Sequence, residues 1–164
     1  MNPEREYIGA GLQETCEQAA KFLESVFQKA GLELQVTERH SAAGCSLNID
    51  GSDTGLLLNE AGELLDALQH LLNQAFGRTL PQGNRIVCDV HSYRATREAE
   101  LKAMAHHAAE RVRATGVPFM FGPMSANERR IIHVTLAESG DLHTESVGEG
   151  PTRKLKVTLQ SVDH

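Results

Sequence analysis

The sequence predicts an α+β fold in two small, closely joined domains. Apolar residues recur with helical spacing in some segments and alternate with polar residues in others, and the two patterns follow one another along the chain. A length of 164 residues suits one or two compact domains. Hydrophobic residues at 40% and charged residues at 23% are typical of globular proteins and exclude a disordered, collagen-like or membrane protein. The predicted order is α-β-β-α-α-β followed by α-β-α-β-β.

The first half of the chain predicts three helical segments and three strands. The first helix ends at Gly31, a residue that favours a C-terminal cap. A four-residue turn, Asn59-Glu60-Ala61-Gly62, separates a short helical segment from a longer helix. In chain order the segments are a helix at 11–30, strands at 32–37 and 45–50, helical segments at 56–58 and 64–76, and a strand at 85–91.

The second half begins without an exposed linker, because the last of these strands passes almost directly into a long helix. That helix ends before Gly116. Ser125 and Glu128 form a capping-box pattern that opens a second helix. In chain order the segments are a helix at 93–115, a strand at 117–121, a helix from 126 to 137, and strands at 142–147 and 153–159. The predicted domains are therefore 11–92 and 93–164.

Three cysteines, Cys16, Cys45 and Cys88, are far apart in the sequence, and each lies within an apolar periodic segment. This pattern favours three buried thiols over a disulfide framework or a zinc site. The first residues lack the apolar core of a signal peptide, and no segment of about 18 uninterrupted apolar residues occurs. We therefore expect a cytoplasmic protein with no membrane insertion.

The formal net charge of -6 conceals a difference between the two halves. Residues 1–92 carry 6 Lys and Arg against 13 Asp and Glu, net -7, whereas residues 93–164 carry 10 against 9, net +1. The second half is therefore the better candidate for binding a polyanion. Aromatic residues make up only 4% of the chain and Trp is absent, so a nucleic-acid site must rely on charge and hydrogen bonds more than on base stacking.

The sharpest candidate site is Arg129-Arg130-Ile131-Ile132-His133 on the capped helix. Arg129 and His133 are four residues apart and share one face, and Arg130 lies at its edge. A guanidinium binds a phosphate through two hydrogen bonds, and an imidazole one turn further on donates to the next oxygen or stacks on a base or sugar. The same spacing is also common on solvated helix faces, so the pair alone does not decide between the two interpretations.

Three motifs occur between Tyr93 and Leu159: Tyr93-Arg94-x-x-Arg97-Glu98, Pro123-Met124-x-x-x-Glu128-Arg129-Arg130-Ile131-Ile132-His133, and Thr144-Glu145-Ser146-x-Gly148-Glu149-x-Pro151-x-Arg153. With these motifs the stretch closely resembles the R-3-H domain, which is named for its Arg-xxx-His motif. The resemblance implies that this domain binds single-stranded nucleic acid, with Arg129 and His133 contacting phosphate or sugar and with Arg130, Arg153 and Lys154 adding charge.

The preceding stretch contains Gly55-Leu-Leu-Leu-x-x-x-Gly62-x-x-Leu65-Asp66-Ala67-Leu68-Gln69. With this motif it is similar to the KH domain that lies directly before the R-3-H domain in bacterial Jag proteins, also called KhpB. The resemblance covers about residues 11–159 and implies a type II KH domain, α-β-β-α-α-β, joined by a long helix to an R-3-H domain, α-β-α-β-β. Jag relatives commonly carry a separate N-terminal domain, which we expect this chain to lack.

One loop departs from the KH pattern. The residues that correspond to the GxxG loop are Asn59, Glu60, Ala61 and Gly62. Glu60 places a carboxylate where a phosphate lies in KH domains, a repulsion of about 1 kcal/mol at contact in a watery site. Together with the net charge of -7 in this half, the loop favours a structural or protein-contacting role over RNA binding.

These observations predict a non-catalytic protein that binds single-stranded RNA, with single-stranded DNA as the other candidate ligand. No GxSxG, P-loop or paired-carboxylate signature occurs, and we expect no cofactor and no metal. The resemblance to Jag proteins implies post-transcriptional regulation linked to cell envelope growth and division, and a small KH-only protein as a partner. The alternative is a protein-interaction scaffold in which the KH half pairs with itself or with another KH domain and RNA binding is weakened.

Overall fold

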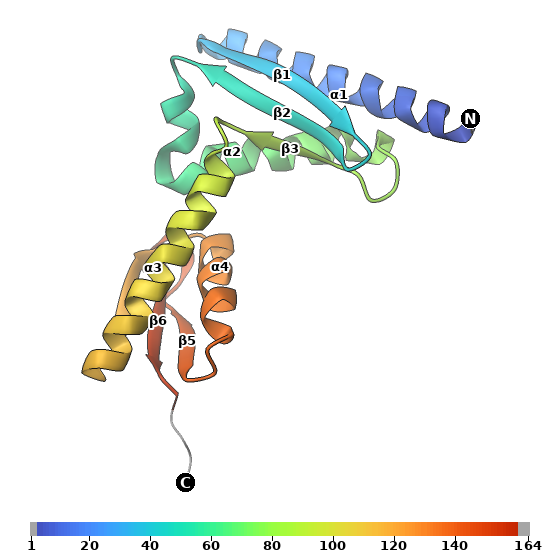
Figure 1. Ribbon diagram of the computed structural model, residues 1–164. Helices are drawn as coiled ribbons and strands as arrows, with labels where there is room; N and C mark the ends of the chain where they lie inside the picture. The colour runs from blue at the N-terminus through green and yellow to red at the C-terminus, as the bar shows by residue number, and fades with distance from the viewer. Residues whose placement is uncertain (1–2, 161–164) are drawn as a thin grey trace. The chain divides into compact units, whose positions relative to one another are not determined.

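The computed structural model describes residues 3–160, which contain four α-helices and six strands (Figure 1). The chain divides into two compact units, of which the first ends at Tyr93 and the second begins at Arg94. Each unit has its own three-stranded sheet and its own hydrophobic core. The predicted α+β class is therefore confirmed. None of the helices within the described range is long and apolar enough to cross a membrane.

The first unit packs its helices on a sheet of order β1-β2-β3, in which β1 is antiparallel and β3 parallel to the central strand β2. Helix α1 lies along β1 and β2, and α2 lies along β3 (Figure 1). The elements are α1 (Pro3–Ala30), β1 (Leu34–Ser41), β2 (Gly44–Gly51), α2 (Thr54–Phe76), a short 3-10 turn (Gly77–Thr79) and β3 (Arg85–Asp89).

The core of this unit follows from strand alternation. Leu47 and Ile49 on β2 are fully buried, whereas Ser46 and Asn48, which alternate with them, are exposed. Residues of one strand point alternately to opposite faces, so one face of the sheet meets the helices and the other meets solvent. The predicted half-buried strands are therefore confirmed.

Cys16 on α1 and Cys45 on β2 form a disulfide, with their Cα atoms 5.6 Å apart. The prediction of three buried thiols is therefore wrong for this pair. The apolar periodicity places both side chains in one core, but it carries no information on whether two core cysteines meet across the helix–sheet interface. Cys88 is buried and lies outside the disulfide.

Helix α2 is interrupted at the predicted four-residue turn. Asn59 is extended, with φ -58° and ψ 152°, and Glu60, Ala61 and Gly62 adopt left-handed conformations, with φ of 49°, 59° and 79°. The left-handed region is costly for residues other than glycine. Glycine adopts this conformation without that cost, so Gly62 suits its place in the turn. The lack of a side chain is also required by packing, because a Cβ at this position would lie 2.9 Å from Cε1 of Tyr93.

The second unit packs α3 and α4 against one face of an antiparallel sheet of order β4-β6-β5. Its core includes Leu101 and Val112 from α3, Ile132 from α4 and Val157 from β6. The elements are α3 (Tyr93–Thr115), β4 (Phe119–Pro123), α4 (Ala126–Ala137), β5 (Leu142–Val147), a short 3-10 turn (Gly150–Thr152) and β6 (Lys154–Leu159).

Candidate nucleic-acid interface

The candidate site begins at the first turn of α4, where the predicted capping box is confirmed. The backbone N–H of Glu128 donates to Oγ of Ser125 at 3.2 Å, and the backbone N–H of Ser125 donates to Oε2 of Glu128 at 3.3 Å. These two bonds satisfy backbone donors that a helix leaves unpaired at its N-terminus. They fix the start of α4 and therefore the direction in which its next residues point.

Arg97 on α3 also contributes to this first turn. Its Nε donates to Oε1 of Glu128 at 2.8 Å, and its Nη1 donates to Oε2 of Glu100 at 3.2 Å. The Glu128 side chain is buried, with 7% of its surface exposed, so the ion pair stabilises a charge that would otherwise be costly to bury. Sequence reasoning alone does not reveal this pairing, since the two residues are 31 positions apart.

Arg129 follows the cap and is half-buried. Its Nη1 donates to the carbonyl oxygen of Met124 at 2.7 Å, and its Nε donates to Oγ of Ser146 on β5 at 3.2 Å. Both bonds hold the guanidinium in one orientation. They leave its second terminal amino group, Nη2, to meet a ligand.

His133 lies one helical turn beyond Arg129 and is exposed. Its Nδ1 is hydrogen-bonded to Oγ1 of Thr144, which is also on β5. An imidazole has two nitrogens that bond in different directions, so Nε2 remains for contact with a ligand. Arg129 and His133 are therefore both held by hydroxyl side chains of one neighbouring strand.

Arg129, His133 and their two partners on β5 line a shallow pocket of about 330 Å³. The structure thus brings together three of the residues that the sequence predicts for the site, Arg129, Arg130 and His133, and adds Thr144 and Ser146. Strand alternation is the sequence pattern that links Thr144 with Ser146, because residues two apart on a strand share a face. The lining residues are Ala126, Arg129, Arg130, His133, Thr144, Ser146 and Leu155.

The structure does not bring Lys154 into this pocket. Lys154 pairs with Val147, whereas its neighbour Leu155 pairs with Ser146 and lines the pocket. Successive residues of a strand point to opposite faces, so the Lys154 side chain lies on the other face of the sheet. Arg153 is exposed and precedes β6, and its carbonyl oxygen accepts a hydrogen bond from the backbone of Met124 at 3.1 Å.

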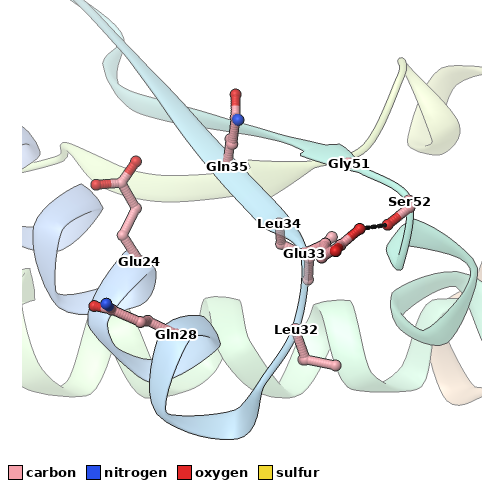
Figure 2. A pocket seen from close by; sticks show the side chains of 8 residues that line it. All are labelled: Glu24, Gln28, Leu32, Glu33, Leu34, Gln35, Gly51 and Ser52. Carbon is pink, nitrogen blue, oxygen red and sulfur yellow. Dashed lines mark hydrogen bonds between the residues drawn. The ribbon is translucent and has the colours of Figure 1, made fainter.

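The first unit contains a different pocket, of about 510 Å³, between the end of α1 and the start of β1 (Figure 2). Two carboxylates face it: Glu24, whose Oε1 accepts a bond from the backbone of Val36, and Glu33, whose Oε2 accepts a bond from Ser52 at 2.7 Å. Like charges repel, so this pocket is unsuited to a phosphate backbone although it is larger than the one on α4.

Comparison with known proteins identifies the second unit. Residues 99–159 match the family model of the R-3-H domain. This range includes α4, β5 and β6 and therefore every residue that lines the pocket on α4. The second unit is an R-3-H domain.

Most of the chain is similar to bacterial proteins named RNA-binding protein KhpB. The relative from Clostridium symbiosum is 30% identical over 156 residues, which span 93% of this chain and 70% of that protein. The Bacillus subtilis relative is 30% identical, covering 87% and 69%. The Lactiplantibacillus plantarum relative is 31% identical, covering 85% of this chain and 43% of that protein. The chain belongs to the KhpB family, as its resemblance to Jag proteins predicts.

Proposed function

We propose that this protein binds single-stranded nucleic acid, RNA in the first place, at the pocket on α4 and carries out no chemical step there. The observation that carries the proposal is the joint placement of Arg129 and His133, each held by a β5 hydroxyl with one nitrogen group left for a ligand. The relatives named RNA-binding protein support RNA as the ligand.

The chemistry of the pocket suits a sugar–phosphate backbone. A guanidinium and an imidazole donate hydrogen bonds to phosphate oxygens, and the exposed Arg130 adds charge at the rim. The pocket is lined by charged, polar and aliphatic side chains, and none of its lining residues is Phe, Tyr or Trp. Binding is therefore expected to depend strongly on salt and weakly on base sequence.

For the first unit we propose a type II KH domain at 11–92, followed by the R-3-H domain at 93–164. Its order of elements supports this assignment, since α2 breaks into two helical segments at Asn59–Gly62. Glu60 and the net charge of -7 of residues 1–92 oppose phosphate binding at this loop. The role that we propose for this unit is structural or protein-contacting.

A second candidate function, pairing with another KH domain, is favoured by one apolar surface. Leu64, Leu68 and Leu71 of α2, which we name the leucine stripe, recur at helical spacing on one face. Leu64 is 45% and Leu71 47% exposed, and Leu68 is only partly buried. We propose that a second KH domain, from a KH-only protein or a second copy of this chain, covers this stripe, because exposed leucines in a regular row are typical of an interaction surface.

The oligomeric state tests this second function. Sedimentation of the wild type is compared with that of Leu64→Lys with Leu71→Lys, using Leu56→Lys as the control because Leu56 is 47% exposed and lies outside the stripe. A dimer that dissociates only in the stripe variant supports self-pairing. A monomeric wild type leaves only a KH-only partner, which a mixing experiment with such a protein then tests.

The binding function is tested with a fluorescent single-stranded RNA pool at two salt concentrations. We expect salt-sensitive binding that is lost when Arg129→Ala and His133→Ala are combined. Combining His70→Ala with Arg78→Ala removes the same two side-chain types from exposed positions of the first unit and serves as the matched control. Binding that is indifferent to the first pair of substitutions would contradict the proposal. A single-stranded DNA pool of the same composition shows which nucleic acid is preferred.

The cellular setting that we propose is cytoplasmic post-transcriptional regulation linked to cell envelope growth or division, as the resemblance to Jag proteins implies. A strain without the gene would be complemented with the wild type or with the Arg129→Ala, His133→Ala variant. Restoration of cell shape and of target RNA levels by the wild type alone is the expected result. Equal restoration by the wild type and the variant would show that the cellular role does not depend on the pocket on α4.

A further inference from the structure

Two residues of β5 with hydroxyl side chains form hydrogen bonds with the arginine and the histidine of the pocket on α4. Thr144 bonds to His133 and Ser146 bonds to Arg129, so the helix and the strand are joined by two matched contacts. We infer that Thr144 and Ser146 are positioning residues that determine which nitrogen atoms of His133 and Arg129 meet the ligand. This inference rests on the proposed nucleic-acid function of the same pocket.

The two contacts fit together because of simple geometry. Four residues along a helix rise by about 6 Å, and two residues along an antiparallel strand rise by about 6.8 Å. Helix α4 and strand β5 run in opposite directions, so the earlier helix residue, Arg129, meets the later strand residue, Ser146. Both contacts therefore form at once without distortion of either element, and the pair of ligand-facing groups acquires a fixed spacing.

At His133 the contact with Thr144 occupies Nδ1. In the neutral ring the Thr144 hydroxyl donates to Nδ1, which places the ring proton on Nε2, and in the imidazolium the same hydroxyl accepts from Nδ1–H. The ligand then meets the imidazole only through Nε2, and the ring is held against rotation. A phosphate oxygen accepts a bond from Nε2–H in the same direction for the neutral tautomer and for the imidazolium.

At Arg129 the contact with Ser146 occupies Nε, and the carbonyl of Met124 occupies one N–H of Nη1. Guanidinium groups bind phosphate bidentately, either side-on through Nε and Nη2 or end-on through Nη1 and Nη2. The bond to Ser146 removes the side-on mode. The ligand therefore meets Arg129 at the terminal end of the guanidinium, through Nη2, which fixes the direction from which the backbone approaches the pocket.

The contact at His133 is tested without RNA by ¹⁵N NMR of the imidazole nitrogens. The wild type is expected to show one dominant tautomer, Thr144→Val the mixture of a free imidazole, and Thr144→Ser the wild-type pattern, since serine restores the hydroxyl. Thr158→Val is the matched control, because Thr158 lies on β6 and pairs with His143 away from the pocket. Identical spectra of the wild type and Thr144→Val would overturn the inference for Thr144.

RNA binding provides the second test, with a labelled oligouridylate as the probe. Loss of one positioning hydrogen bond is expected to weaken binding about threefold to tenfold in Thr144→Val and in Ser146→Ala. Binding is expected to return in Thr144→Ser and to be unchanged in Thr158→Val. The amide spectrum of each variant establishes that it is folded, and Thr144→Ala replaces Thr144→Val if the latter is not.

The outcomes separate this inference from the proposed function. Full binding by Thr144→Val and Ser146→Ala, together with loss of binding in the Arg129→Ala, His133→Ala variant, would overturn the positioning role and leave the function standing. If the wild type itself does not bind the probe, the proposed function fails. The imidazole spectra then still decide whether Thr144 orients His133.

Discussion

Nε of Arg97 lies 2.8 Å from Oε1 of Glu128, so a half-exposed cation on α3 is paired with a nearly buried anion in the first turn of α4. The same carboxylate closes the capping box with Ser125 and lies near the positive end of the helix dipole. Three favourable interactions therefore converge on Glu128. Since Arg129 and His133 extend from the same helix, the precision of the pocket depends on this anchor.

Replacing Glu128 is expected to destabilise the R-3-H domain. Glu128→Ala removes the ion pair and half of the capping box, at a cost of about 2 kcal/mol. Glu128→Gln keeps a hydrogen-bonding side chain and is expected to cost about 1 kcal/mol. Urea unfolding followed by amide signals of α4 measures both, with the exposed Glu138→Ala as the control. Equal stability of Glu128→Ala and Glu138→Ala would show that Glu128 is not an anchor.

Arg129→Lys is expected to weaken RNA binding about tenfold although the charge is unchanged. A lysine has one nitrogen and cannot bond to Met124, Ser146 and a phosphate in the arrangement that the guanidinium allows. Arg130→Lys is the matched control, because Arg130 is exposed and contributes charge alone. Fluorescence anisotropy with a single-stranded RNA measures both variants. Equal affinities would show that the pocket senses only net charge.

Gly62→Ala tests the turn inside α2. The residue has a φ of 79°, and a Cβ there would lie 2.9 Å from the ring of Tyr93, so the substitution is expected to destabilise the first unit by about 2 kcal/mol. Gly55→Ala is the control, since Gly55 is helical and a Cβ added there would have no atom within 4 Å. That substitution is expected to be neutral or stabilising by up to about 1 kcal/mol. Thermal unfolding followed by circular dichroism compares the two variants.

Much of the fold could be predicted because it depends on local patterns. The break in α2 follows from a four-residue turn between two periodic segments, and the start of α4 follows from Ser125 and Glu128. The shared face of Arg129 and His133 is likewise a consequence of helical geometry. These features require only residues a few positions apart.

What the sequence does not reveal depends on contacts between distant residues. The Cys16–Cys45 disulfide joins positions 29 apart, and the bond from Arg129 to Ser146 joins positions 17 apart. Strand alternation already predicts that the side chains of Lys154 and Leu155 point to opposite faces of the sheet. Which of these faces lies beside α4 is decided by packing. Such contacts are fixed by the tertiary fold and leave no local pattern.

The disulfide gives a prediction of its own for the first unit. Closing a chain segment of this length restricts the unfolded state, and its reduction is expected to cost about 3 to 4 kcal/mol. Urea unfolding with and without dithiothreitol measures the difference in the wild type and in Cys16→Ser, which is expected not to respond. Alkylation of the unreduced protein, followed by measurement of its intact mass, gives the number of free thiols. Three alkylated cysteines in the purified, unreduced protein would contradict the bond.

Arg113 and Asp141 provide a test of pH dependence in the second unit. Nε and Nη2 of Arg113 donate to the two oxygens of Asp141 at 2.6 and 2.8 Å, which ties the end of α3 to the turn before β5. The hydrogen bond from Arg113 is the main reason why the pKa of Asp141 is lowered, with the charge of Arg113 adding to it and desolvation opposing it.

A carboxyl group whose pKa is lower in the folded than in the unfolded protein stabilises the fold at pH values above its unfolded pKa. That contribution is lost as the pH falls through the folded pKa. We therefore expect Asp141→Asn to be less stable than the wild type at neutral pH and to approach the wild type as the pH falls through the lowered pKa of Asp141 in the folded protein. The effect is small, because the ion pair is exposed to solvent and is screened.

A double-mutant cycle isolates this pair. Urea midpoints of the wild type, Asp141→Asn, Arg113→Gln and the combined variant are measured at neutral and at acidic pH, on amide signals of β5. The coupling between the two substitutions is expected to be favourable at neutral pH and to vanish in acid, because protonated Asp141 no longer attracts Arg113. A coupling that is the same at both pH values would mean that the contact is held by packing and not by charge.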